Sequence, residues 1–469
     1  MNRCCSLLAT LVALTTAAAA VAQDRRPVAF TNARLVPVQG PVIEVGTLVL
    51  RNGKIEAIGK DVPAPAGARV IDATGMTILP GLVSAWSRAG LGRGDTPAPA
   101  ERQRGRRGRA EPEGDGGGRN DAQNRAATKV VAALHPRQDV FGELLRAGIT
   151  SLALTPQGGG LPGLGAVLRG DAKTLDQLTL DDDAFVQLTM ARSSATKKLL
   201  KETLAKAKQH LEQRKQPKPA ATPAPAEATP PAPPAETPKP EPKPEPKPEP
   251  KPEPKPEPKP EPKPEPKPEA KPDAAKPPEP PPDPNLDVLA DLLDGKRRAI
   301  VQIDSAADFQ HWQQAVADDV KFPRTIVVPR HDPFQGTVDL VLEPLKAMQC
   351  TVLLAPDLST LPRSRHLIHP ARLLHDAGIE VGFVLGDDPT TVRFLFYRLM
   401  ELVRCGLPAD VALRGVTLVP AKALGIDART GSLEAGKDAN LLVFRGDPLS
   451  PSSELLQVWL EGHEVERQP

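Results

Sequence analysis

The residues from Val70 to Gly90 read Val-Ile-Asp-Ala-Thr-Gly-Met-Thr-Ile-Leu-Pro-Gly-Leu-Val-Ser-Ala-Trp-Ser-Arg-Ala-Gly. A polar turn precedes the apolar run Met76–Leu79, and a second apolar run begins at Leu82. Between them, Pro80-Gly81 interrupts regular structure, because proline lacks a backbone donor and glycine tolerates sharp turns. The stretch therefore predicts a strand, a sharp corner and a second strand.

Short alternating apolar runs precede this junction. They extend from Val28 to Ile78, and Asn52-Gly53 between two of them is typical of a hairpin turn. A few strands of this kind bury too little surface to be stable alone. Matching strand patterns occur at Asn440–Phe444 and Leu456–Leu460, near the other end of the chain. We therefore expect the two ends to build one structure together.

After Trp86 the pattern alternates between strands and helices. The runs that predict strands are Ile149–Leu154, Ala299–Ile303, Thr325–Val328, Thr351–Ala355 and Ile379–Leu385. Strands joined through helices form parallel sheets, and their continuous apolar character indicates that both faces are buried. About seven candidate strands precede Leu407, one fewer than a closed barrel of eight requires.

The Pro80-Gly81 junction resembles the sandwich-to-barrel junction of the amidohydrolase superfamily, and Gly431–Phe444 resembles the closing motif of that family. The text from Asn32 to Gly59 is similar to the opening of its imidazolonepropionase type. The resemblance implies an α/β fold in which a (β/α)8 TIM-like barrel is inserted into a small β-sandwich. The barrel would comprise residues 81–423, and the sandwich residues 28–80 with 424–466. The resemblance also implies hydrolysis of carbon–nitrogen bonds other than peptide bonds, with zinc or another divalent metal as cofactor.

The first metal-binding motif of that family is missing from this chain. The first barrel strand of the family ends in His-x-His, whereas the matching positions here hold Trp86 and Arg88. A guanidinium has only donors and carries a positive charge, so Arg88 cannot replace an imidazole ligand. At a further ligand position, Gln302 stands where the family has histidine. We therefore expect Arg88 and Gln302 to contact a bound substrate or ligand rather than a metal.

Two positions keep a residue type that can bind a metal. His331 follows the run Thr325–Val328, and Asp387 follows the last clear strand, where the family has an aspartate that binds metal and shuttles protons. Asp388 is the alternative in a second register. Asp387 is thus the candidate catalytic residue, and His331 and Asp387 are the candidate metal ligands. Aspartate before Pro389 is equally typical of a helix N-cap, and His331 of an ordinary loop histidine.

Two segments depart from globular composition. Residues 91–125 are rich in arginine and glycine, and residues 217–284 contain Pro-Lys-Pro-Glu repeats. Both are predicted to be disordered inserts within the barrel sequence, and the second favours polyproline II. The first insert lacks aromatic residues and carries acidic residues among its arginines, which argues against RNA binding.

The start of the chain resembles a secretory signal peptide. The apolar run Leu7–Leu14 is followed by Ala20-Val21-Ala22, which fits a cleavage site. We expect residues 1–22 to be removed, the protein to be periplasmic or extracellular, and the mature chain to lack a transmembrane segment. The formal net charge of +2 argues against a dedicated nucleic-acid partner. Cys350 and Cys405 alone make no disulfide framework.

Three functional hypotheses follow. The first is a catalytically impaired member of the superfamily that binds a small molecule or pairs with a related, active amidohydrolase subunit. The second is an active hydrolase with an atypical site that uses Asp387 and His331. The third is an envelope-associated scaffold that works through its proline-rich tract. The residues at positions 86, 88 and 302 favour the first hypothesis over the second.

Overall fold

The structure is a computed structural model that describes residues 26–91, 122–136, 138–170, 174–190, 193–215, 283–316, 320–329 and 335–466. The predicted signal peptide lies outside the described residues, as do His331 and nearly all of both predicted inserts. Within the described part, no helix combines the length and the apolar character needed to cross a bilayer.

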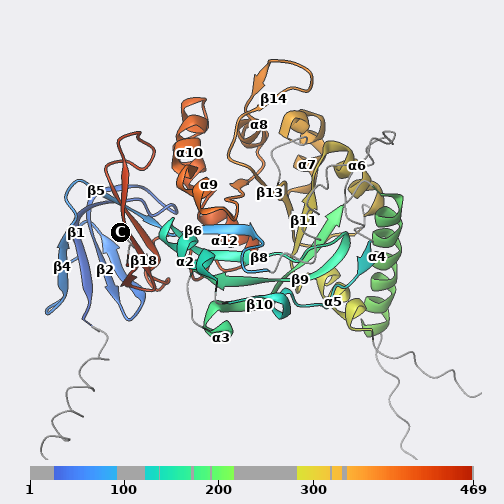
Figure 1. The fold of residues 1–469 in the computed structure, drawn as a ribbon, viewed down its shortest axis with the longest axis horizontal. Helices are drawn as coiled ribbons and strands as arrows, with labels where there is room; N and C mark the ends of the chain where they lie inside the picture. The colour runs from blue at the N-terminus through green and yellow to red at the C-terminus, as the bar shows by residue number, and fades with distance from the viewer. Residues whose placement is uncertain are drawn as a thin grey trace, which may run out of the picture. The chain divides into compact units, whose positions relative to one another are not determined.

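The two ends of the chain form one β-sheet, seen at the left of Figure 1. Its strand order is β19-β18-β17-β5-β1-β2-β3, and β4 pairs with β1. The strands are β1 (Val28–Leu35), β2 (Ile43–Arg51), β3 (Lys54–Gly59), β4 (Arg69–Asp72), β5 (Met76–Pro80), β17 (Leu441–Arg445), β18 (Glu454–Leu460) and β19 (His463–Glu464). β17 runs antiparallel to β5, which places Leu441 opposite Pro80. An edge-to-face contact of Phe30 with Trp459, with ring centroids 5.2 Å apart, joins both chain ends in one core.

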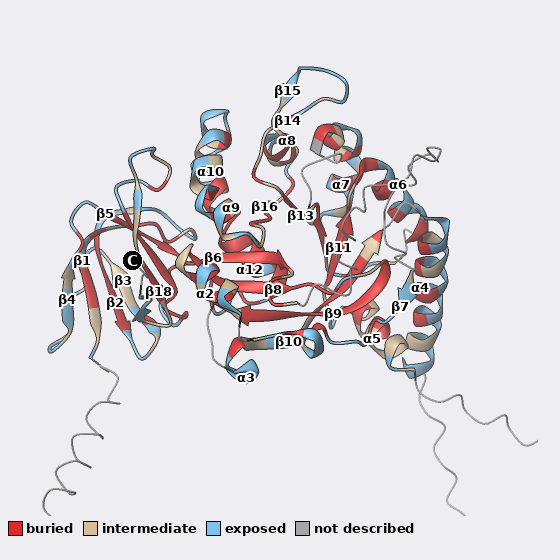
Figure 2. Ribbon diagram, viewed as in Figure 1, coloured by how far each residue is buried: buried red, intermediate tan, exposed pale blue. Residues whose placement is uncertain are grey.

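A second sheet forms the barrel. Its strands follow the order β16-β13-β12-β11-β10-β9-β8-β6. They are β6 (Leu82–Ser87), β8 (Ile149–Leu154), β9 (Gly160–Arg169), β10 (Thr179–Met190), β11 (Ala299–Ile303), β12 (Arg324–Val327), β13 (Thr351–Leu354) and β16 (Val381–Phe383). Figure 2 shows that most of these strands are buried, as their apolar runs predict.

β10 is the strand that the sequence analysis missed. Three aspartates, Asp181–Asp183, occupy the start of β10 and interrupt the apolar pattern by which strands are recognised. β9 also departs from the predicted scheme, because it runs antiparallel to both β8 and β10. The other neighbouring pairs along the barrel are parallel. The barrel path therefore has eight strands, as the family resemblance implies, where the sequence patterns alone indicate about seven. A long hairpin of β8 and β9 stands in place of one helical crossover.

A short backbone segment bridges the two ends of the barrel sheet. The amide of Phe383 in β16 donates to the carbonyl oxygen of Gly415 at 2.8 Å, and the amide of Val83 in β6 donates to the carbonyl oxygen of Val416 at 3.0 Å. The following helix, α12 (Leu418–Leu424), adds Val419 to the same interior core as Val83. The predicted fold class, a TIM-like barrel inserted into a β-structure made by both chain ends, is confirmed.

Helices and short elements cover the barrel sheet and connect its strands. The helices are α2 (Asp139–Arg146), α3 (Leu175–Leu178), α4 (Ser194–Lys215), α5 (Pro284–Leu293), α6 (Ala306–Ala315), α7 (Leu342–Met348), α8 (Pro370–Asp376), α9 (Pro389–Arg393), α10 (Leu395–Arg404) and α11 (Ala409–Arg414). The short elements are η1 (Val130–Ala133), η2 (Gln335–Val341), β7 (Gln123–Asn124), β14 (Ser359–Thr360) and β15 (Leu367–Ile368).

Helix α4 ends just before the proline-rich sequence, and helix α5 begins just after it. A row of basic side chains on α4 faces a row of aspartates that runs along α5 to its C-terminal end. His210 contacts Asp287 at 2.8 Å, and Lys215 pairs with Asp294 at 2.6 Å. Hydrogen bonds from Lys215 and Lys296 lower the pKa of Asp294 to about 2. Helices α4 and α5, called the stem below, are therefore held together by ion pairs on both sides of the proline-rich sequence.

We predict that residues 216–282 can be replaced by a flexible glycine–serine linker of about ten residues without loss of the fold. The stem already fixes the ends of the replaced segment, and long surface insertions change stability little. The midpoint of thermal unfolding, followed by circular dichroism, should change by no more than about 3 °C.

A variant of the stem provides the comparison. Leu200 of α4 is fully buried, so Leu200→Ala should lower the free energy of unfolding by about 2–5 kcal/mol. A linker variant that unfolds as readily as Leu200→Ala would contradict the view that the stem is self-sufficient.

Candidate functional site

Trp86 occupies the position at which the amidohydrolase superfamily, which the sequence resembles, has its first metal-binding histidine. In the pairing of β6 with β8, the four residues Ser84–Ser87 lie opposite the three residues Leu152–Leu154, which is a β-bulge. The Ser84 hydroxyl donates to the carbonyl oxygen of Trp86 at 3.1 Å and closes this bulge. The indole, only 6 % exposed, belongs to the interior core with Ile300 and Leu353. The end of the first strand is thus apolar and packed.

Arg88 and Asp387 meet where β6 and β16 end. The backbone amide of Arg88 donates to Oδ2 of Asp387 at 2.8 Å. The guanidinium carbon of Arg88 lies 5.7 Å from the centre of the Trp86 ring, a cation–π geometry. The second carboxylate oxygen of Asp387, Oδ1, is buried and has no hydrogen-bond partner. The structure therefore brings together two of the residues singled out from the sequence.

Gln302 lies on the inner face of β11, two residues beyond Ile300 of the interior core. Its amide nitrogen donates to Oδ1 of Asp304 at 3.1 Å, and the register places it beside Thr189 of β10. Gln187 lies on the same face of β10 as Thr189 and is fully buried, and its Oε1 has no hydrogen-bond partner. The sequence analysis missed Gln187 and Thr189 because it missed their strand.

Asp388, the alternative to Asp387, has a different role. Its carboxylate accepts hydrogen bonds from the amides of Thr390 and Thr391 at 3.3 and 3.0 Å and from the Thr391 hydroxyl at 2.8 Å. These bonds, that from the Thr391 hydroxyl above all, hold the pKa of Asp388 below its ordinary value. Asp388 is therefore the N-cap of α9, whereas Asp387 faces the strand ends.

The described residues at this end of the barrel do not fit a divalent metal. An indole offers only an N–H donor and a guanidinium only donors, so neither Trp86 nor Arg88 can be a ligand. Gln302 could offer only its neutral amide oxygen, a weaker ligand than the imidazole it replaces, and Asp387 offers one oxygen beyond its contact with Arg88. His331 lies outside the described residues. Catalytic zinc sites take three protein ligands, which this set does not supply.

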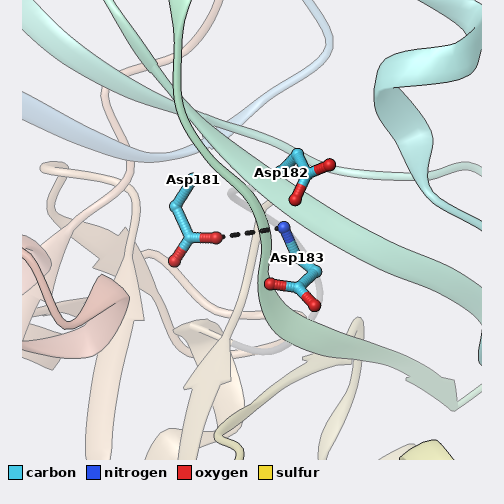
Figure 3. A group of neighbouring side chains, drawn as sticks. All are labelled: Asp181, Asp182 and Asp183. Carbon is cyan, nitrogen blue, oxygen red and sulfur yellow. Dashed lines mark hydrogen bonds between the residues drawn. The ribbon is translucent and has the colours of Figure 1, made fainter.

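Figure 3 shows a group of acidic side chains elsewhere, Asp181, Asp182 and Asp183, whose oxygens lie within 4.8 Å of one another. They lie at the start of β10, at the other end of the strand from Thr189. Lys129 pairs with Asp182 at 2.7 Å, and Arg297 pairs with Asp183 at 3.0 Å. Two of the three carboxylates are thus neutralised by the protein itself.

Comparisons with known proteins find similarity to amidohydrolases. The model of the amidohydrolase family matches residues 333–465. An amidohydrolase, tasK, of Hapsidospora irregularis is 32 % identical over 91 residues, 19 % of this chain and 9 % of that protein. An imidazolonepropionase of Erwinia tasmaniensis is 36 % identical over 96 residues, 20 % of this chain and 23 % of that enzyme. These alignments span less than a quarter of either curated relative.

The crystal structure of an amidohydrolase from Thermotoga maritima shares the fold, with a TM-score of 0.65 and 19 % identity, covering 94 % of this chain and all of that one. This likeness shows that the two chains share a fold. The family-model match over residues 333–465 and the alignment with imidazolonepropionase support membership of the amidohydrolase superfamily. The family resemblance inferred from the sequence is thereby confirmed.

We predict that Asp387 acts as a clasp between β6 and β16. Asp387→Ala leaves the Arg88 amide without its acceptor, so the free energy of unfolding from urea denaturation should fall by about 1–3 kcal/mol. Asp387→Asn keeps one acceptor oxygen and should lose less. Removing a group held for catalysis commonly stabilises a protein, so a more stable Asp387→Ala variant would contradict the clasp.

Asp388 should contribute to the stability of the fold in a pH-dependent way. Because its folded pKa is lowered, its stabilisation is complete above the pKa of an unfolded aspartate, about 4, and is lost as pH falls through the lower folded value. The difference in melting temperature between wild type and Asp388→Ala should therefore shrink between about pH 5 and pH 2. Asp388→Asn, an N-cap that does not titrate, should lack this dependence. An unchanged difference across that range would refute the assignment.

Proposed function

We propose that this protein is an exported member of the amidohydrolase superfamily that has lost metal-dependent hydrolysis and acts as a binding or partner subunit. The observation that carries the proposal is the packing of the Trp86 indole into the barrel core at the first ligand position. Export rests on the signal-like sequence of residues 1–22.

The chemistry of the family explains why this change matters. A bound divalent metal lowers the pKa of its water to about 7 and polarises the scissile carbonyl, so hydrolysis at neutral pH depends on it. With Trp86 and Arg88 in place of two imidazoles, the described residues supply a packed wall and a positive charge where a cation would sit. We infer that the chain gains core packing at this end of the barrel and gives up the metal.

The remaining polar groups suit ligand binding. Oε1 of Gln187 and Oδ1 of Asp387 are acceptor oxygens that are buried without a donor. Buried polar atoms nearly always have a partner, whether protein, water or ligand. A small molecule that carries N–H groups would provide such donors, and this is the ligand class that we propose for the barrel. A related, active amidohydrolase subunit is the partner that we propose for the chain as a whole.

The test is zinc retention by the full chain without residues 1–22. After incubation with zinc and removal of loosely bound ions, mass spectrometry of the metal should find well under one ion per chain. One or two tightly held ions per chain would overturn the proposal, because they would require ligands outside the set described above.

A matched pair of variants identifies the cause. Trp86→His with Arg88→His restores two imidazoles beside the carboxylate of Asp387, which together make the three protein ligands of a catalytic zinc site. We expect zinc retention to rise towards one ion per chain in this double variant. Adding Asp387→Ala should return it to the wild-type level, and circular dichroism checks that each variant is folded.

A further inference from the structure

A cavity of about 670 Å³ lies at the end of the barrel where β11, β12 and β13 begin, opposite the strand ends discussed above. This volume falls within the range of small-molecule sites. The cavity is walled by the C-terminal end of α5, by α6, by α7 and by the residues that lead into β12. Binding at this cavity would not depend on the proposed function.

The walls of the cavity combine polar groups with apolar and aromatic side chains. Trp312 of α6 and Phe322 meet edge to face, with ring centroids 6.3 Å apart at 90°. Pro344 and Met348 of α7 line the facing side. A flat apolar body is the shape that such walls accommodate, because aromatic rings prefer offset or edge contacts with other rings.

Arg324 brings a positive charge to this apolar wall. Its Nε donates to the carbonyl oxygen of Phe322 at 3.3 Å, and its Nη2 donates to the carbonyl oxygen of Val320 at 3.1 Å. The guanidinium carbon lies 4.5 Å from the centre of the Phe322 ring. These contacts fix the orientation of the group but do not neutralise it, and burial lowers its pKa. Among the described residues, no carboxylate lies within ion-pair distance of Arg324.

The other groups around the cavity add to the positive charge. Asp294 is the acidic residue of the described lining, and it is engaged by Lys215 at 2.6 Å and Lys296 at 2.9 Å. Lys321 lies in the same lining. Burial raises the pKa of the Cys350 thiol to about 11, so the thiol stays neutral and supplies no counter-charge. Arg324 is half-buried, and an anionic ligand would give its guanidinium the counter-charge that the described residues do not supply.

We propose that this cavity binds a small organic anion with a flat apolar body, such as an aromatic carboxylate. The ring system lies against Trp312 and Phe322, and the carboxylate contacts the guanidinium of Arg324, whose remaining N–H groups provide charge-assisted hydrogen bonds.

Isothermal titration of the full chain with 2-naphthoate tests the proposal. We expect saturable binding of one molecule per chain, and at least tenfold weaker binding of the uncharged 2-naphthalenemethanol. Arg324→Gln should weaken binding of 2-naphthoate at least tenfold. Arg365→Gln is the control: it removes an exposed arginine that is not among the lining residues of the cavity, and it should leave the binding of 2-naphthoate unchanged. No binding at millimolar 2-naphthoate, or equal binding by wild type and Arg324→Gln, overturns the proposal.

A second variant keeps the test decisive if Arg324→Gln does not fold. Ala347 lines the cavity from the exposed side of α7, so Ala347→Trp fills the cavity and leaves Arg324 in place. Binding of 2-naphthoate should be lost in this variant. Tryptophan fluorescence locates the site: 2-naphthoate should quench wild type and Trp86→Phe, and quench Trp312→Phe much less. Retained binding in Ala347→Trp, or quenching that survives Trp312→Phe, would place the ligand elsewhere and defeat the proposal.

Discussion

Gly81 is the point on which the two parts of the described structure depend. Its amide donates to the carbonyl oxygen of Asn440 at 2.8 Å, which ties the start of the barrel to the C-terminal end of the chain. A Cβ atom at this position would lie 2.2 Å from the Thr150 hydroxyl oxygen of β8, closer than any real contact. Only glycine therefore allows β5 to turn into β6 while both neighbours stay paired. The barrel is in effect one long insertion whose ends are fixed side by side, which limits the entropy lost in forming it.

The junction, the shared sheet and most barrel strands could be predicted because they rest on local patterns. Proline and glycine mark the corner, and apolar runs mark strands whose two faces are buried. β10 could not be predicted in the same way, because Asp181–Asp183 carry the pattern of a loop and are held in a strand by ion pairs to Lys129 and Arg297. Tertiary contacts thus override local preference at that point.

The candidate site shows a different limit of sequence reasoning. Substitution at positions 86 and 88 is visible in the sequence, but the inward packing of Trp86 depends on the bulge between Ser84 and Ser87, which no local motif indicates. Asp387 and Asp388 are adjacent, and the sequence does not tell which of them faces the strand ends. The structure separates them, because the carboxylate of Asp388 accepts from the amides of α9. Gln187 is recognised as a buried polar residue of the barrel interior only from the pairing of β10 with β9 and β11.

On the proposed function, these features explain how the barrel keeps its fold without a metal. Metal ligands at strand ends are polar groups held out of water, and they add little to stability unless the metal is present. A tryptophan at position 86 instead buries apolar surface, and the hydrogen bond from the Arg88 amide to Asp387 joins the ends of β6 and β16. At the other end, the half-buried Arg324 lies against the Phe322 ring without a carboxylate partner in the described structure, an arrangement that stability alone does not favour. A residue that lowers stability without a structural benefit often has a functional role. Arg324 therefore indicates a binding role for the end of the barrel where the strands begin, which TIM barrels do not ordinarily use for chemistry.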